Sequence, residues 1–365
     1  MSQPYRFLDI PLIDSPDDDQ HGWKYEAVHR LIAANRMNIR GNTDLAPSVQ
    51  SLITDRASQL FFDNTWVLAV QGPDDAPEEV GWARVGLTLH EDLDKAHLAV
   101  CVHPLKRRQG IGSALLAWGE QLIADAGRTL IFGGAMYGPG EDHEPYLTTS
   151  EGSTVPTTAS GVSFSMNRGY EVAQAQLQSV LAVPLRPSLA SELMAQTLPH
   201  TTGYKLHTWY CEIPQEWKDS FANLKEAFSL DAPQGGLQFE QEHWDVDRVD
   251  QMVQEVLSQG DLFVMTAAEH IDTSEIVGFT ELRWSAQPGE EAAEQWFTIV
   301  SSQHRGHRLG MWMKLVNLDA FMSRCPGVRR VYTDNAQENA HMLAINVAMG
   351  FQPGGGEALI VKNLS

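Results

Sequence analysis

The sequence predicts a chain of two α/β domains that share one design. Three observations lead to this prediction. The chain has 365 residues, which is long for one hydrophobic core and sufficient for two domains of ordinary size. Segments with the apolar patterns of strands and of helices follow one another along it. Matching segments also recur in its two halves, so that one order of elements is present twice.

The composition is that of a globular protein, with 43% apolar and 20% charged residues. The opening segment, MSQPYRFLDIPLIDSPDDD, lacks the basic and then apolar pattern of a secretory signal, and no apolar run has the length of a membrane span. Three scattered cysteines, Cys101, Cys211 and Cys325, form neither a disulfide framework nor a metal knuckle. We therefore expect a cytoplasmic protein.

The charge balance argues against one class of partner. Acidic residues number 47 and basic residues 26, which gives a net charge of −21. Nucleic acid binding needs a clustered positive surface, so we expect no nucleic acid partner. A cationic substrate would be attracted to such a chain, although an acidic surface also serves solubility alone.

The repeat is carried by three pairs of segments. The first two pairs keep an offset of about 198 residues, and the third has an offset of 181, so the first copy has about 17 extra residues after its matching glycine. We place the extra residues in the polar stretch 138–160, which has the Gly, Pro, Ser and Thr content of a loop. The pairs are VGWARV (80–85) with VGFTEL (277–282), Val102 and Gly112 with Val300 and Gly310, and RGYEV (168–172) with MGFQP (349–353).

Each copy is expected to contain helices, a hairpin, a third strand, a turn, a helix, a strand, a second helix and a closing strand. In the first copy the strands are predicted at 66–70, 80–87 and 96–102. Apolar residues then recur at helical spacing after the turn, as Ile111, Ala114, Leu115, Trp118 and Leu122 in the first copy and as Leu309, Trp312, Met313, Val316 and Ala320 in the second. We predict domains at 1–190 and 205–365, joined by a linker at 191–204.

The turn in each copy has a composition suited to phosphate. The first junction reads LKRRQGIG (105–112) and the second reads QHRGHRLG (303–310). A turn between a strand and a helix presents free backbone N–H groups at the positive end of the helix, and arginine adds charge. Glycines allow ligand oxygens to approach the backbone. The Walker pattern is absent, and a dinucleotide fingerprint would need a glycine where Leu115 stands.

The larger array is more specific. Val102, Pro104, Arg107, Gly110 and Gly112 form V-x-P-x-x-R-x-x-G-x-G, followed by an amphipathic helix and a later GY or GF. This array resembles the acetyl-CoA site of the GCN5-related N-acetyltransferases (GNAT proteins), and its presence in both halves is similar to the tandem enzymes of the mycothiol synthase kind. The resemblance implies an α+β sandwich with a mixed central sheet and helices on both faces, acetyl-CoA as acyl donor, a small amine as acceptor and no metal.

The resemblance also implies which residues contact acetyl-CoA. In such proteins the amides of the turn hold the pyrophosphate, and an asparagine-rich segment after the fifth strand contacts other parts of the coenzyme. Carried over to this chain, the contacts are Val102, Arg107, Gln109, Gly110, Ile111, Gly112 and Ser113 in the first copy, and Ile299, Val300, Arg305, Gly306, His307, Arg308, Leu309, Gly310, Met311, Asn335 and Asn339 in the second.

A general base is expected only in the second copy. In mycothiol synthase-like enzymes a glutamate six residues before the last valine of the strand is the base, which corresponds to Glu294 here and to Ala96 in the first copy. Strand alternation predicts that Glu294 shares a face with Trp296, Thr298 and Val300. Glu294 could equally be a surface acid, and Glu281 is the reserve candidate.

The general acid is in doubt in both copies. The resemblance places a tyrosine four residues before the GF glycine, and this chain has Asn346 there and Ser165 in the first copy. Asn346 could donate a hydrogen bond to the thioester or simply pair within its helix. His304 and His307 could neutralise phosphate or be exposed polar residues. The segment DHE (142–144) and the pair His90 and His97 lack the spacing of metal ligands.

Three functions remain open at this point. The first is a tandem N-acetyltransferase whose C-terminal domain acetylates a primary amine, with a degenerate N-terminal copy that helps to form the substrate cleft. The second is a non-catalytic protein that binds or senses acyl-CoA. The third is catalysis in the N-terminal domain, which has the better glycines, with a base from elsewhere. The acid upstream of the second junction favours the first function.

Overall fold

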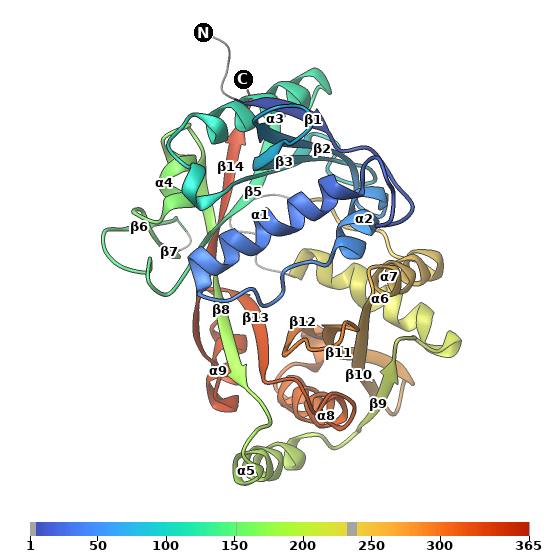
Figure 1. The fold of residues 1–365 in the computed structure, drawn as a ribbon. Helices are drawn as coiled ribbons and strands as arrows, with labels where there is room; N and C mark the ends of the chain where they lie inside the picture. The colour runs from blue at the N-terminus through green and yellow to red at the C-terminus, as the bar shows by residue number, and fades with distance from the viewer. Residues whose placement is uncertain (1–4, 151, 232–238, 365) are drawn as a thin grey trace. The chain divides into compact units, whose positions relative to one another are not determined.

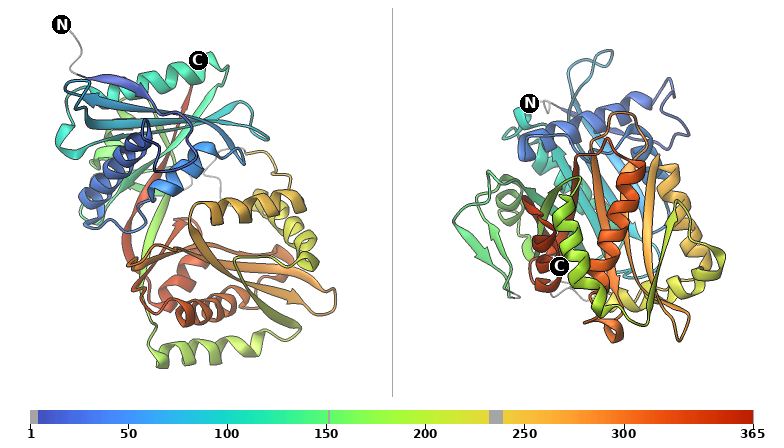
Figure 2. Two further views of the ribbon diagram at one scale, coloured as in Figure 1. Left: turned by 45° about the vertical axis from the view of Figure 1, so that its right-hand side comes forward. Right: turned by 90° about the horizontal axis from the view of Figure 1, so that it is seen from below.

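A computed structural model describes residues 5–150, 152–231 and 239–364. The chain forms two compact units. The first unit comprises Met1–Ala175 and Gly355–Ser365, and the second comprises Gln176–Gln234 and Gln238–Gly354. Each contains a mixed sheet with helices on both faces, as expected from the sequence (Figures 1 and 2). No described helix is both long and apolar enough to cross a membrane.

The sheet of the first unit has the strand order β1-β2-β3-β4-β5-β14. Alternation along β2 explains how both faces are covered. Trp66, Leu68 and Val70 pack in one cluster with residues of α1 and α2, whereas Val67 and Ala69 pack with α3 on the other face. The elements are β1 (Arg6–Asp9), α1 (Gly22–Arg40), α2 (Val49–Ala57), β2 (Phe62–Gln71), β3 (Glu78–Thr88), β4 (Lys95–Val102), α3 (Ile111–Asp125), β5 (Leu130–Tyr137), β6 (Tyr146–Thr148), β7 (Thr154–Pro156) and α4 (Ser160–Met166).

The sheet of the second unit has the order β8-β13-β12-β11-β10-β9. Helix α6 covers one face, where Phe221 packs against Phe279 with ring centroids 4.7 Å apart. Helix α8 covers the other face beneath Gly278. The elements are β8 (Glu171–Ala182), α5 (Pro187–Thr197), β9 (Tyr204–Tyr210), α6 (Gln215–Asp231), α7 (Val246–Ser258), β10 (Asp261–His270), β11 (Glu275–Ser285), β12 (Ala292–Val300), α8 (Leu309–Arg324), β13 (Arg330–Ala336), α9 (Ala340–Met349) and β14 (Gln352–Asn363), and three short 3-10 turns lie at 104–106, 198–200 and 302–304.

The closing strands differ from the contiguous domains expected from the sequence. Strand β8 follows α4, yet its residues 176–182 pair with β13 in the second unit. Strand β14 follows α9, yet its residues 356–363 pair with β5 in the first unit. Periodicity identifies a strand but not its neighbour, so the sequence does not reveal this exchange. The expected linker 191–204 also includes part of α5, whose Leu193 is buried in the core of the second unit.

The polar stretch 138–160 is less irregular than expected. Strands β6 and β7 form a small antiparallel hairpin within it. Val155 of this hairpin is buried in the core of the first unit, so the insertion is anchored to the domain.

In each sheet one pair of parallel strands is paired over only three residues. Strands β4 and β5 are parallel and pair only over Lys95–His97 with Leu130–Phe132. Strands β12 and β13 likewise pair only over Ala292–Glu294 with Arg330–Tyr332. Beyond those residues each pair separates, and the junction turn follows the end of the first strand in each case.

Candidate functional site

The two junctions have the same backbone conformation. Gly110 and Arg308 are the residues before α3 and α8, and both are left-handed, with φ of 84° and 55°. Two residues earlier, Arg108 and Gly306 are also left-handed, with φ of 64° and 87°. Each junction therefore places one glycine and one arginine at these positions, in opposite order. An arginine in the left-handed conformation costs about 1–2 kcal/mol, but the turn has the same backbone conformation. The positions of the glycines therefore do not show which junction is better suited to a ligand.

A cavity of about 810 Å³ lies at the first junction, within the first unit. It is bordered by the turn, the start of α3, α4 and the separated strands β4 and β5. The predicted coenzyme contacts that line it are Val102, Arg107, Gly110, Ile111, Gly112 and Ser113. Gln109, the remaining predicted contact of this copy, is exposed and does not line it.

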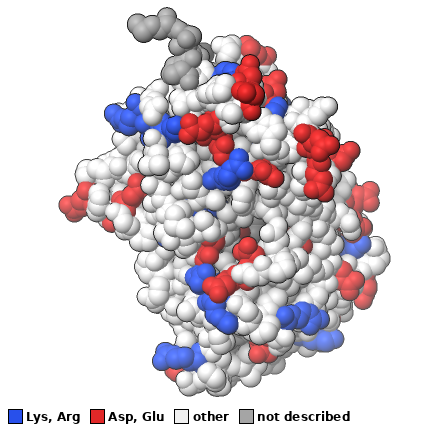
Figure 3. Space-filling model, in the orientation of Figure 1, with Lys and Arg blue, Asp and Glu red and all other residues white. Residues whose placement is uncertain are grey.

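The charge of this cavity is opposite to that of the chain. Lys106, Arg107, Arg108 and Arg168 line it, and among the described residues no aspartate or glutamate does. On the face drawn in Figure 3, acidic and basic side chains are scattered among uncharged ones. A concentration of cations in one cavity of a chain with net charge −21 favours an anionic ligand.

Two of these arginines are held by neutral partners. Arg107 donates to Asn35 Oδ1 at 2.6 Å and to Ser160 Oγ at 3.3 Å. Arg168 donates to Ser113 Oγ and, at 3.1 Å, to the carbonyl oxygen of Phe164, over whose ring its guanidinium lies at 3.9 Å. Their charges are therefore not cancelled by carboxylates and remain available to a ligand.

The start of α3 adds backbone donors to the same place. Gly110 precedes the helix without a side-chain cap, and Ala114 donates the first N–H of the helix to the Gly110 carbonyl oxygen. The amides of residues 111–113 precede that bond, as the first N–H groups of a helix do. Together with Arg107 and Arg168 they form a site suited to a phosphate or pyrophosphate.

Sequence reasoning missed Arg168. The segment RGYEV identifies the repeat, but nothing within it indicates a role for the arginine. Its counterpart in the second copy is Met349, and the counterpart of Ser113 is Met311. A cation present in one copy and replaced by an apolar residue in the other was the available signal.

The other end of the cavity is apolar. Leu98, Leu116, Ala135 and Ile360 line it and are buried. Gly133 and Leu98 directly follow the last paired residues, and the strands are still close at this point, because a Cβ on Gly133 would lie 2.5 Å from the Leu98 carbonyl oxygen. The cavity thus has a cationic mouth and an apolar end.

The corresponding place in the second unit contains a chain of buried polar side chains. Lys314 Nζ donates to Asn346 Oδ1 at 2.6 Å, and Asn346 Nδ2 donates to Asn335 Oδ1 at 2.6 Å. Lys314 and Asn346 are each 1% exposed. Burial lowers the pKa of Lys314 to about 7.

The repeat relates these three residues to the first cavity. Their counterparts, from the offsets of the helices and the register of the parallel strands, are Leu116, Ser165 and Ala135. All three counterparts line the first cavity. Larger or charged side chains therefore occupy in the second unit the space that is open in the first.

The three asparagines expected to contact a ligand form hydrogen bonds within the second unit instead: Asn335, Asn339 and Asn346. Asn346 does not pair within its own helix, as one alternative supposed, but bonds to α8 and β13. Asn339 begins α9, where its Oδ1 accepts the N–H of Met342 at 3.2 Å.

The side chains of the second junction also contact their own unit. Arg305 Nε donates to the Val300 carbonyl oxygen at 3.2 Å, and Arg308 donates to the Gln196 carbonyl oxygen at 3.3 Å. Tyr204 bonds His304 Nδ1 at 3.0 Å, and its ring centroid lies 5.2 Å from that of His307. The predicted contacts Ile299, Leu309, Gly310 and Met311 are buried.

A smaller cavity of about 160 Å³ lies near the second junction. Ile299, Val300 and Ser302 border it together with Leu224 and Phe228 of α6. It has about one fifth of the volume of the cavity in the first unit. Its lining contains no arginine or lysine in the described part of the chain.

Strand β12 places Glu294 on the other face from the one expected. Glu281 pairs with Phe297 but Leu282 pairs with Gln295, so Trp296 is an extra residue in a β-bulge. The bulge interrupts the alternation of side chains. Glu294 consequently lies on the face of Phe297, opposite Thr298 and Val300, and the prediction of a shared face was wrong.

The reserve candidate, Glu281, is buried and paired. It is 2% exposed and forms an ion pair with Arg283. The Arg283 guanidinium lies 4.1 Å from the ring centroid of Trp296, which is 48% exposed. Lys225 lies on this face too, with Nζ 4.2 Å from the Phe297 ring centroid, and burial lowers its pKa to about 8.

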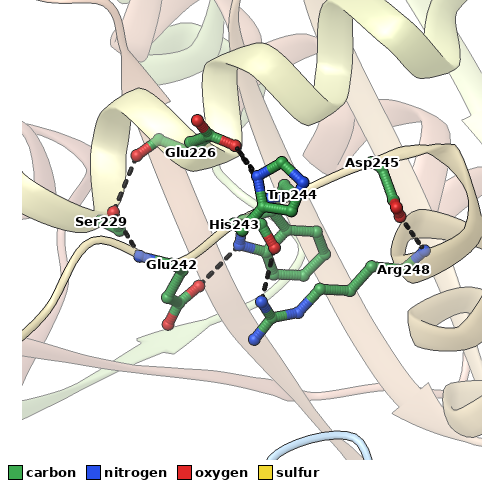
Figure 4. A network of polar contacts seen from close by, with 7 residues as sticks. All are labelled: Glu226, Ser229, Glu242, His243, Trp244, Asp245 and Arg248. Atoms are coloured by element: carbon green, nitrogen blue, oxygen red, sulfur yellow. Dashed lines mark hydrogen bonds and ion pairs between the residues drawn. The ribbon is translucent and has the colours of Figure 1, made fainter. Parts of the chain in front are cut away.

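A polar network fixes residues 242–248, the segment that contains Trp244 (Figure 4). Glu226 accepts the backbone N–H of Trp244 at 2.9 Å, and the Trp244 indole donates to Glu242 at 2.6 Å. Asp245 begins α7 by accepting the N–H of Arg248 at 2.8 Å. Trp244 is held with its ring centroid 4.5 Å from Lys225 Nζ, so the chain's own ammonium occupies this aromatic site.

Comparison with solved structures defines the fold. A tandem GNAT protein from the clavulanic acid biosynthesis pathway, in a structure without acetyl-CoA, has a TM-score of 0.71 and 21% identity over 98% of each chain. A GCN5-related N-acetyltransferase from Sphaerobacter thermophilus has a TM-score of 0.60 and 18% identity over 98% of this chain and 95% of that one. No family model and no curated protein matches the sequence. The chain thus has the tandem GNAT fold, which the sequence pattern had predicted.

Proposed function

We propose that the protein is an acyltransferase that binds acetyl-CoA in the first unit and transfers the acetyl group to a primary amine of a small, cationic molecule. One observation carries this proposal, namely the cavity of about 810 Å³ that opens between separated strands at a helix start, with four cations and no carboxylate in its described lining. Acetyl-CoA carries its negative charges on phosphates at one end and an uncharged thioester at the other.

The residues of this cavity fit that ligand. Arg107, Arg168 and the amides that begin α3 suit a pyrophosphate. The edge of β4 beyond His97 is not paired with β5, so its backbone can bond the amides of the pantetheine arm. Leu98, Leu116 and Ile360 suit the apolar end near the acyl group.

This proposal places the acetyl-CoA site in the first unit, whereas the sequence analysis expected catalysis in the C-terminal domain because of Glu294. In the second unit Lys314, Asn346 and Asn335 occupy the equivalent space. The counterpart of Arg168 is Met349, so Arg305 has no second arginine at the equivalent position. Binding there would require a buried ammonium and two amides to give up their partners. We therefore propose that the second unit binds no coenzyme.

A primary amine as acceptor is supported by two observations. The net charge of −21 attracts cations to the surface as a whole. A further structure with this fold is a glucosamine N-acetyltransferase region of a fungal multi-domain protein, with a TM-score of 0.59 and 12% identity over 98% of this chain and 38% of that one.

A second candidate is a non-catalytic protein that binds acyl-CoA. The described lining of the cavity contains no carboxylate or histidine to accept a proton. The lining hydroxyls of Tyr170 and Ser165 donate to Glu120 Oε1 and to the Gly161 carbonyl oxygen, both at 3.0 Å.

Two measurements on the full chain separate these candidates. Calorimetric titration with acetyl-CoA should give one site per chain. Release of the coenzyme thiol should then require an amine from a panel of polyamines, amino sugars and peptides, with the acetylated product detected by mass. Binding without release across the panel would favour the second candidate, and no binding would contradict both.

A further inference from the structure

We propose that Glu357 is the group that accepts the proton of the amine in the first unit. This inference rests on the proposed function and deepens it. Glu357 lies on β14, the strand that the end of the chain contributes to this unit. The proton acceptor of the N-terminal copy would thus come from the opposite end of the sequence.

The Glu357 carboxylate lies directly against a residue that lines the cavity. A Cβ built on Gly134 would be 1.7 Å from Glu357 Oε1 and 2.6 Å from its carboxyl carbon. Gly134 lines the cavity where β4 and β5 separate. A side chain at this position would have to displace the carboxylate, which lies directly behind this part of the wall, although Glu357 itself is not among the described residues of the lining.

Alternation along the two strands shows which face Glu357 occupies. Glu357 is the register partner of Met136, whose sulfur accepts a hydrogen bond from Arg40 of α1 at 3.4 Å. Ala358 and Ile360 follow Glu357 by one and three residues, so their side chains lie on the opposite face of β14. There they pack in the core with Tyr170. Glu357 therefore faces the α1 side of the sheet, and α3 and α4 cover the other side.

The cavity reaches both of these faces. Asn35 and Ile39 of α1 line it, as do Leu116 of α3 and Phe164 of α4. It therefore passes through the gap between β4 and β5. An acyl group held in this gap would face the Glu357 side, from which an amine can approach without crossing the phosphate site.

Two other carboxylates of this unit also contact residues of the cavity wall, Tyr170 and Ser160. Glu120 accepts from Tyr170 Oη at 3.0 Å and from Lys362 Nζ at 2.8 Å. Glu141 accepts the N–H of Ser160 at the start of α4. Glu120 belongs to α3, on the side of the sheet opposite to Glu357, whereas the Glu357 carboxylate contacts the glycine that lines the gap between β4 and β5.

The step balances with these groups. The ammonium gives a proton to the Glu357 carboxylate, and the nitrogen lone pair forms a bond to the thioester carbonyl carbon. The C–S bond then breaks, and the nitrogen loses a second proton, which the thiolate receives. The products are the amide and the coenzyme thiol, and Glu357 returns its proton to solvent.

The test compares Glu357→Gln with wild type, with acetyl-CoA and the best amine of the panel. Glutamine keeps the shape but accepts no proton, so we expect kcat to fall about 100-fold or more. The Kd for acetyl-CoA should stay within about twofold, and the acidic limb of the pH profile of kcat/KM should disappear. Glu357→Asp should retain part of the activity. Glu171→Gln, an exposed glutamate of the same unit, serves as the matched control.

Gly134→Ala provides a second test that leaves the carboxylate in the chain. Its methyl group would displace the carboxyl group, so kcat should fall while the melting temperature stays near that of wild type. Unchanged kcat and pH profile in Glu357→Gln would overturn this inference but leave the proposed function standing. A wild type that binds acetyl-CoA and acetylates no amine would overturn the transferase proposal, and this inference with it.

Discussion

Arg168 and Arg107 come from different segments and line the same cavity, and each is held by neutral hydrogen-bond partners. Such arginines are costly to place together unless an anion joins them, because their like charges repel. A phosphate-bearing ligand would relieve this repulsion. The pair therefore defines the cationic end of the cavity at the scale of single residues.

We expect Arg168→Gln to weaken acetyl-CoA binding about 10- to 100-fold, because a hydrogen bond to a charged group contributes about 1.5–3 kcal/mol. Calorimetry at two salt concentrations checks this, and the difference should be larger at low salt. Arg329→Gln, which removes an exposed arginine of the second unit, is the control. Equal affinities of Arg168→Gln and wild type would exclude Arg168 from the site.

Lys314 gives the second unit a pH dependence of known sign. Burial lowers its pKa in the folded chain from the ordinary 10.5 to about 7. Between these values the unfolded chain binds more protons than the folded chain, so this group makes the free energy of unfolding rise with pH from about 7 to 10.5. Below pH 7 it contributes no further change.

We expect Lys314→Met to reduce this rise in the unfolding of the second unit. Chemical unfolding of wild type and variant at several pH values from 7 to 10 measures it. Lys205→Met removes an exposed lysine and should leave the pH dependence as in wild type. The same slope in Lys314→Met and wild type would show that Lys314 is not the titrating group.

At the scale of elements, β14 completes the first unit. Its Ala358 and Ile360 are buried in the core of that unit, and Ile360 also lines the cavity. Strand β5 pairs with β4 over only three residues, so β14 supplies most of its hydrogen bonds. The last strand of the chain therefore supports the ligand site near its beginning.

We expect Ile360→Ala to lower the free energy of unfolding of the first unit by about 2–4 kcal/mol, the usual cost of such a cavity in a core. It should also weaken acetyl-CoA binding. Ile276→Ala makes the same change in the buried part of β11 in the second unit and should leave the affinity as in wild type. Thermal unfolding with and without acetyl-CoA measures both effects. An affinity loss shared by both variants would contradict a specific role of β14.

At the scale of the whole molecule, the repeat could be predicted from the sequence because its pattern is local. Strand alternation at 66–70 and helical spacing from Ile111 and from Leu309 lie within β2, α3 and α8. The positions of both junctions follow from the same patterns, and their likeness in sequence matches their likeness in backbone.

The difference between the two copies could not be predicted, because it depends on long-range contacts. The bulge at Trp296 reverses the face of Glu294, and no local pattern signals an inserted residue. Lys314 lies on an apolar helix in the sequence, and only the fold brings it to Asn346 and Asn335. The pairing of β14 with β5, and with it the position of Glu357, likewise requires the three-dimensional structure.

The central claim is that one chain carries two junctions of like backbone and that only the first binds acetyl-CoA. Arg107 and Arg305 occupy equivalent positions in the two junctions, so Arg107→Glu and Arg305→Glu form a matched pair. Calorimetric titration of both variants with acetyl-CoA tests the claim most directly. The account predicts that Arg107→Glu abolishes binding and that Arg305→Glu leaves one site with affinity within about twofold of wild type. Loss of binding in Arg305→Glu with binding retained in Arg107→Glu would contradict it.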